Sequence, residues 1–261
     1  MTSPNVGAFR HSATSARVRF RESTVQEIAQ LWTDATGLST AHIADGCVRA
    51  GLQVRCGPAA VTAVSDRAPR LAGRCLPVRH FGSVDVFLEA IERSHPGDVL
   101  IVDNQGRTDE SCVGDLVALE AKAAGLSGIA IWGLHRDTRD LRDIGLPVFS
   151  LGALPAGPKR LDERRRNTFS SAEFGEHTIR TRDTAFGDED GLIFVQEDRA
   201  NEVLMHALQI RDVERSQASR IRLGTTLRDQ VDFSAYVQAR RSDPQLTLRE
   251  HLRRVGGTVE V

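Results

Sequence analysis

Two residue pairs, Gly114-Asp115 and Arg136-Asp137, have the types and the spacing that chemistry on a small anion would need. Twenty residues separate the two pairs. The first pair opens an expected helix over residues 116–124, and the second follows an expected strand over 129–132. A helix start offers free amides and a partial positive charge, and a carboxylate beyond a strand end can bind a hard cation. Together the pairs suit a small anionic substrate that is held on a divalent metal.

Each pair also has a simpler structural interpretation. Asp115 could cap its own helix, which is a frequent role for aspartate. Asp137 could cap the helix that the sequence predicts from Thr138, or it could form a surface ion pair with Arg136. Taken one at a time, the two pairs leave these interpretations open.

The composition of the chain excludes several broad classes of function. Its 34 basic and 35 acidic residues give a formal net charge of −1, without the basic excess of a general nucleic-acid or membrane binder. No apolar run approaches the ~18 residues of a membrane span, and no secretory signal is expected at the N-terminus. The four cysteines show no CxxC spacing, so free thiols in a reducing cytoplasm are expected instead of a zinc site.

The apolar periodicity predicts one α/β domain, with a flexible segment before it and a helical arm after it. Residues 1–22 are expected to be flexible, 23–197 to form the domain, and 198–261 to form a C-terminal helix and an arm for oligomer contacts. The alternation of helices and strands over 70–151 indicates an α/β sandwich. The predicted helices cover 39–51, 84–91, 116–124, 138–144 and 198–222, and the predicted strands cover 71–80, 99–102, 129–132 and 147–151.

Three local signals add detail to this outline. Capping boxes at residues 24–27 and 247–250 predict two further helix starts, and Ser83 is expected to cap the helix that follows it. Residues 169–195 are expected to form an antiparallel β piece around a turn at 188–191. His42, His80 and His135 share no metal-ligand spacing, so surface or wall positions are expected for them.

Over roughly residues 35–215 the chain resembles the RraA-like family, and the two residue pairs fall inside this resemblance. The family includes metal-dependent class II pyruvate aldolases that act on 4-hydroxy-4-methyl-2-oxoglutarate and 4-carboxy-4-hydroxy-2-oxoadipate. The segments that carry the resemblance are, in order, residues 38–41 with Asp45, 96–103, 114–116, 128–130, 135–137, 147–149 and 188–191.

The resemblance implies a fold and an assembly. The fold would be an α/β protein of the β/β/α swivelling-sandwich type, a single domain followed here by the C-terminal helical arm. The chain would assemble as a trimer or a hexamer with its sites at subunit interfaces. A glutamate from the next subunit would help at each site, and Glu214 is the candidate for it.

The resemblance also implies roles for the site residues. Arg136 would bind the keto oxygen of a 2-oxo acid, and Asp137 would ligate Mg²⁺ or Mn²⁺. Asp115 would act in catalysis by orienting the waters of that metal ion. The backbone amides that would hold the pyruvyl carboxylate belong to Gly114, Asp115, Leu116 and Val117.

Three functions follow from the resemblance. The first is a lyase that cleaves a carbon–carbon bond in 4-hydroxy-2-oxo acids to give pyruvate, and that also decarboxylates oxaloacetate. The alternative is a non-catalytic protein regulator, since RraA proteins of the same fold inhibit an RNA-degrading nuclease. The third is a demethylmenaquinone methyltransferase, which is disfavoured because no glycine-rich loop follows a first strand.

Overall fold

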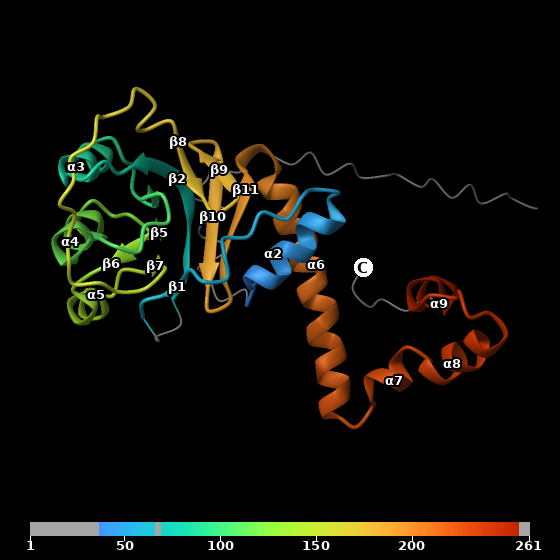
Figure 1. Ribbon diagram of the computed structural model, residues 1–261. Helices are drawn as coiled ribbons and strands as arrows, with labels where there is room; N and C mark the ends of the chain where they lie inside the picture. Colours follow the sequence, from blue (N-terminus) through green and yellow to red (C-terminus); the bar gives the residue numbers. More distant parts are fainter. Residues whose placement is uncertain (1–36, 66–68, 256–261) are drawn as a thin grey trace, which may run out of the picture.

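A curved sheet of seven strands forms the centre of the computed structural model, which describes residues 37–65 and 69–255 (Figure 1). The strand order is β1-β7-β5-β3-β2-β10-β11, parallel from β7 to β2 and antiparallel at both edges. The strands are β1 (Thr62–Ala63), β2 (Leu71–Arg79), β3 (Val99–Asp103), β5 (Gly128–Trp132), β7 (Val148–Ser150), β10 (Asp183–Asp188) and β11 (Gly191–Gln196).

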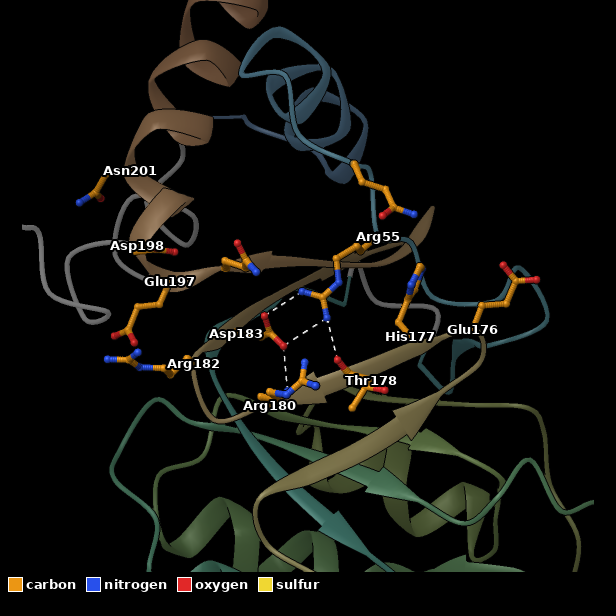
Figure 2. A pocket seen from close by; sticks show the side chains of 12 residues that line it. Arg55, Glu176, His177, Thr178, Arg180, Arg182, Asp183, Glu197, Asp198 and Asn201 are labelled. Atoms are coloured by element: carbon orange, nitrogen blue, oxygen red, sulfur yellow. Dashed lines mark hydrogen bonds and ion pairs between the residues drawn. The ribbon is translucent and has the colours of Figure 1, made fainter. Parts of the chain in front are cut away.

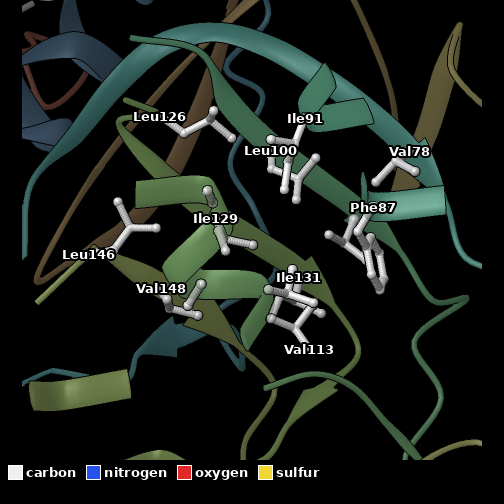
Figure 3. Packing of buried hydrophobic residues seen from close by; sticks show 14 of the residues in the cluster. Val78, Phe87, Ile91, Leu100, Val113, Leu126, Ile129, Ile131, Leu146 and Val148 are labelled. Atoms are coloured by element: carbon white, nitrogen blue, oxygen red, sulfur yellow. The ribbon is translucent and has the colours of Figure 1, made fainter. Parts of the chain in front are cut away.

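Three helices cover one face of the parallel strands: α3 (Asp85–Glu92), α4 (Asp115–Ala123) and α5 (Thr138–Ile144). Their apolar sides meet Leu100, Ile129 and other strand residues in one core cluster (Figure 3). The apolar run at 99–102 in β3 is fully buried, as expected for a strand that is covered on both faces, and Asp103 at its end is buried in an ion pair with Arg79. The expected cap of α3 is wrong, because its N-cap is Val84 and no side chain caps it.

The opposite face of the sheet is covered by a small antiparallel hairpin of β8 (Ser171–Phe174) and β9 (His177–Arg180). Phe174 from this hairpin packs on Phe194 of β11, with ring centroids 5.4 Å apart. The expected antiparallel piece therefore exists as two hairpins, since β9 pairs with β8 while β10 pairs with β11. Sheet, hairpin and helices form the α/β sandwich that the periodicity predicts, and its β/β/α type is the one that the resemblance implies.

Two further helices, α2 (Thr40–Arg49) and α6 (Glu197–Arg222), pack together beyond β10 and β11. Ser39 caps α2 through the backbone amide of His42, and Nε2 of His42 lies 2.7 Å from a carboxylate oxygen of Glu214 on α6. Asp188, expected only in a turn, is buried and accepts hydrogen bonds from the amide and the hydroxyl of Thr40. These contacts tie the helical layer to the sheet.

The C-terminal arm projects away from the sandwich in Figure 1 and contains α7 (Leu227–Gln230), α8 (Phe233–Ser242) and α9 (Leu248–Val255). One helix is predicted there and three are found. A small core holds them together, in which the ring of Tyr236 lies 5.6 Å from that of His251. The flexible segment expected at 1–22 and the capping box at 24–27 lie outside the described residues. No helix among the described residues is long and apolar enough to cross a membrane.

Candidate functional site

A two-stranded parallel ribbon brings the two residue pairs together. Its strands are β4 (Ser111–Val113) and β6 (Leu134–His135), with Val113 opposite His135. The ladder continues one residue further, because the amide of Arg136 donates to the carbonyl of Val113 at 2.9 Å. Gly114 follows β4 and Arg136 follows β6, so the parallel pairing closes the gap of twenty residues between the two pairs.

Gly114 lies directly against the side chains of the second pair. A methyl group built on Gly114 would overlap Oδ2 of Asp137 and would lie 3.2 Å from both Cγ and Nε of Arg136. Any side chain at position 114 would therefore displace the two groups expected to bind metal and substrate. The fold thus brings Gly114, Arg136 and Asp137 together.

Asp137 stands at the start of α5 but does not cap it with its side chain. Its backbone is left-handed, with φ 59° and ψ 40°, and its carboxylate makes no capping hydrogen bond. Oδ2 lies 3.4 Å from Nε of Arg136, and the side chain is 36% exposed. Asparagine and aspartate tolerate this backbone better than most residues, and such conformations concentrate at functional sites. The surface ion pair with Arg136 that the sequence left open is therefore present, whereas side-chain capping does not describe this residue. The exposed part of the carboxylate can still meet a ligand.

The start of α4 has Gly114 as its N-cap and Asp115 as its first helical residue. Oδ1 of Asp115 accepts a hydrogen bond from the amide of Leu116 at 2.8 Å, so this amide already has a partner. The side chain of Val117 is buried in the core, so only its backbone can face a ligand. Leu116 is 72% exposed, so its side chain points to solvent and its backbone amide serves Asp115.

His135 supports the turn that carries Arg136 and Asp137. Its Nδ1 lies 2.6 Å from the hydroxyl of Ser150 on β7, and its Nε2 lies 2.9 Å from the hydroxyl of Thr138 on α5. Burial and the neighbouring Arg142 lower the pKa of His135, which favours the neutral ring. His135 is therefore a buried wall residue that ties the turn to the sheet and the helix.

The carboxylates at this site suit a hard cation that keeps several of its water ligands. No group of three or more histidine, cysteine or acidic side chains within the described ranges could enclose a metal. Mg²⁺ is commonly bound through one or two carboxylates and several waters, so Asp137 with Asp115 nearby in the fold fits such an ion. A zinc centre, which needs three or four protein ligands, does not fit.

Two features of the site were not found from sequence. Gly157 contacts Arg136 from a loop, since a methyl group built on Gly157 would lie 3.2 Å from Nη1 of Arg136. The loop itself is held by Ser111, which donates from its amide and its hydroxyl to the carbonyl of Ala156. Only the richness of this loop in proline and glycine could have drawn attention to it.

Glu214 does not join this site within one chain. It lies on α6 beside His42, in the layer that packs on β10 and β11, whereas α4 and α5 pack on β3, β5 and β7 at the other end of the sheet. The expectation that a neighbouring subunit supplies a glutamate stays a prediction.

A separate hollow of about 1100 Å³ lies between β9, β11 and the start of α6 (Figure 2). Arg55 crosses it and binds Asp183 at 2.8 Å and the carbonyl of Thr178 at 3.0 Å. Four basic and four acidic side chains line the hollow, namely Arg55, His177, Arg180, Arg182, Glu176, Asp183, Glu197 and Asp198. This balance favours no ligand charge, and none of the predicted site residues is among them.

Comparison with known proteins matches residues 40–194 to the RraA-like family model, described as Aldolase/RraA. A Shewanella oneidensis protein named "Putative 4-hydroxy-4-methyl-2-oxoglutarate aldolase" is 31% identical over 48% of this chain and 75% of its own length. A Halalkalibacterium halodurans protein of the same name is 31% identical over 46% of this chain, which spans only 56% of that relative. The crystal structure of Streptomyces coelicolor RraAS2, described as an unusual member of the RNase ES inhibitor RraA protein family, shares the fold. Its TM-score is 0.62 at 23% identity, over 72% of this chain and 94% of that one.

Proposed function

This chain belongs to the RraA-like family, and from that premise we propose that it is a divalent-metal-dependent carbon–carbon lyase. The proposed substrates are 4-hydroxy-2-oxo acids, cleaved to give pyruvate, with oxaloacetate decarboxylation as a second activity. The observation that carries the proposal is the contact of Gly114 with both Arg136 and Asp137. This contact unites an anion-binding helix start, a guanidinium and an open carboxylate in one place.

Substrate binding uses the start of α4. The pyruvyl carboxylate is assigned to the backbone amides at Gly114, Asp115 and Val117, where the helix dipole favours negative charge. The amide of Leu116 joins this set only if the carboxylate of Asp115 releases it. Arg136 then reaches the 2-keto oxygen with its planar group of donors.

Cleavage breaks the C3–C4 bond, and its electron pair moves toward the 2-keto oxygen as an enolate forms. Arg136 places positive charge and donors where that negative charge develops, which is the most effective position for electrostatic stabilisation. The 4-hydroxyl proton leaves to water that Asp115 orients, and C3 is protonated to complete pyruvate. Mg²⁺ or Mn²⁺ held by Asp137 would act as a Lewis acid for the same charge.

Decarboxylation of oxaloacetate fits the same groups. Loss of CO₂ also breaks a bond at C3 and leaves the enolate of pyruvate, so Arg136 meets the same developing charge. We assign the protein to the cytoplasm because its cysteines are free thiols, which suit a reducing compartment. Its proposed partners are 2-oxo acids and further copies of itself, in a trimer or a hexamer.

A protein regulator of a ribonuclease is the second candidate. Its support is the shared fold with RraAS2. A likeness at 23% identity carries the fold and no more, so the regulator ranks below the lyase.

The first experiment measures pyruvate released from oxaloacetate and from 4-hydroxy-4-methyl-2-oxoglutarate, with Mg²⁺ and then with EDTA. We expect metal-dependent release that Asp137→Ala abolishes. The control is Asp140→Ala, which removes another exposed carboxylate from the first turn of α5 and should retain activity. Oxaloacetate turnover that persists in Asp137→Ala would refute the site. Wild-type release no higher than that of Mg²⁺ alone would favour the regulator.

A further inference from the structure

The loop segment 156–162, here called the strap, is fixed at both of its ends. At one end Ala156 accepts two hydrogen bonds from Ser111, at 2.8 Å from the amide and 3.0 Å from the hydroxyl. At the other end the amide of Asp162 donates to the carbonyl of Phe81 at 2.8 Å. A segment without helix or strand hydrogen bonds of its own is thus held by residues of other elements.

A buried ion pair fixes the strap near its second end. Arg160 donates from Nε and Nη2 to Oε1 of Glu110, at 3.0 and 2.8 Å, and also from Nη2 to the amide oxygen of Asn104 at 2.9 Å. The side chains of Arg160 and Glu110 are only 14% and 5% exposed. Charges buried to this extent need their partners, because an unpaired buried charge is strongly disfavoured. The pair therefore sets where the strap lies.

The strap touches the site between these two anchors. A methyl group built on Gly157 would lie 3.2 Å from Nη1 of Arg136, and one built on Gly114 would lie 3.2 Å from Cγ and Nε of the same side chain, so both glycines line the space around this arginine. Glu110 and Gly114 lie directly before and after β4. The short segment 110–114 therefore holds the strap through Glu110 and faces Arg136 through Gly114. The guanidinium of Arg136 thus lies between Gly157 of the strap and Gly114.

We propose that Glu110 and Arg160 are positioning residues, which hold Gly157 of the strap against Arg136 and so set the direction of its guanidinium. This inference rests on the proposed lyase function for its kinetic consequence, but its geometric consequence does not depend on it. Neither residue touches the substrate, so both act through Arg136.

The kinetic consequence concerns kcat more than KM. In Glu110→Gln the charge of the anchor is lost while its size is kept, so the strap shifts and Arg136 is misplaced. Misplacement by about 1 Å can cost up to about 100-fold in rate. Since Arg136 acts on charge that develops in the transition state, kcat should fall about 10- to 100-fold with a smaller change in KM.

The matched control is Asp183→Asn. Asp183 forms a similarly buried ion pair with Arg55, with side chains 6% and 18% exposed, in the separate hollow of Figure 2. This variant should lose stability as Glu110→Gln does, without a change in kcat. In an Arg136→Ala background, Glu110→Gln should have no further effect on kcat, because the group it positions is gone.

The experiment labels arginines of the full chain with phenylglyoxal and measures by mass spectrometry the rate at Arg136 relative to Arg139. We expect faster labelling of Arg136 in Glu110→Gln, and the wild-type rate in Asp183→Asn. Unchanged labelling in Glu110→Gln, or the same change in Asp183→Asn, would overturn the proposal. If Glu110→Gln changes the labelling of Arg136 but the wild-type protein releases no pyruvate, the lyase function is refuted while the positioning role is supported.

Two further variants test the proposal even if Glu110→Gln fails to fold. Ser111→Ala removes one of the two hydrogen bonds to Ala156, and Gly157→Ala adds a methyl group next to Arg136. Each should alter Arg136 labelling while the protein stays folded by circular dichroism. If both leave the labelling rate unchanged, the strap does not position Arg136.

Discussion

Gly114 shows how much of this site depends on a single missing side chain. A methyl group there would overlap Oδ2 of Asp137, so Gly114→Ala should move the carboxylate and lower metal-dependent pyruvate release at least about 10-fold. Its melting temperature should change little, because the site side chains are exposed and can move. Gly46→Ala is the control: its methyl group would lie 2.6 Å from the carbonyl of Val203, far from the site. It should lower the melting temperature and spare kcat, and the reverse pattern would contradict the assignment.

Arg136 carries the largest predicted energetic effect of one residue. Removing one oxyanion-stabilising donor typically costs about 3 kcal/mol, so Arg136→Ala should lower kcat by roughly 100-fold or more. Arg136→Lys should recover only part of this loss, because lysine lacks the planar pair of donors. The comparison variant is Arg139→Ala, on the exposed side of α5, which should keep wild-type kcat. The measurement is steady-state kinetics with oxaloacetate. Equal losses of kcat in Arg136→Ala and Arg139→Ala would show that Arg136 has no specific role in the mechanism.

At the scale of elements, the carboxyl end of β2 carries a buried histidine that should make stability depend on pH. Burial lowers the pKa of His80, whose ring stacks on Phe87 of α3 and bonds to Asn104. Because the folded pKa lies below the ordinary histidine value of 6.5, the unfolded chain binds the proton more readily. The contribution is fully present above pH 6.5 and is lost as pH falls below it.

Urea denaturation at pH 7.5 and pH 5.5 tests this consequence. The free energy of unfolding should drop between the two values, and the drop should shrink in His80→Phe, which keeps an aromatic ring against Phe87. His95→Phe is the control, since the side chain of His95 is largely exposed. An undiminished drop in His80→Phe would show that other groups cause the acid sensitivity.

The elements found from sequence are those with a local pattern. The buried run of β3, the α4 start after Gly114 and the α5 segment are all where periodicity and turn residues placed them. The ribbon of β4 and β6 was missed, because strands of two or three residues have no period to detect. Its parallel register is set by tertiary packing, and this register is what joins the two residue pairs.

The candidate site also contains some residues that the sequence could predict and others that it could not. Gly114, Arg136 and Asp137 could be named because the resemblance to a family covers them, and the structure brings them into contact. Their support could not be named in advance. The anchor between Glu110 and Arg160 joins residues fifty positions apart, and nothing in the local sequence of either one predicts such a pair.

At the scale of the whole molecule, α6 changes character along its length. The first half buries Ala200, Val203, Leu204 and Ala207 against α2 and the sheet, and Ile210 is buried too, whereas no residue from Arg211 on is buried. The helix then leads into the arm, where Leu223 is 85% exposed and Ile221, Leu227 and Val237 are also exposed. A monomer gains nothing by displaying four large apolar residues, so we propose that the arm packs on another copy of the chain.

Leu223→Glu tests that role on the full-length protein. Burying a leucine at an interface contributes about 2 kcal/mol, so placing a charge there should weaken association at least roughly 30-fold. Multi-angle light scattering should then show a smaller mass than the trimer or hexamer expected for the wild type. Val48→Glu makes the same kind of change on the exposed side of α2 and should keep the wild-type mass. Because the site was expected at a subunit interface, a loss of mass together with a loss of kcat would connect the arm to the chemistry. If Leu223→Glu keeps the wild-type mass, another surface holds the assembly together.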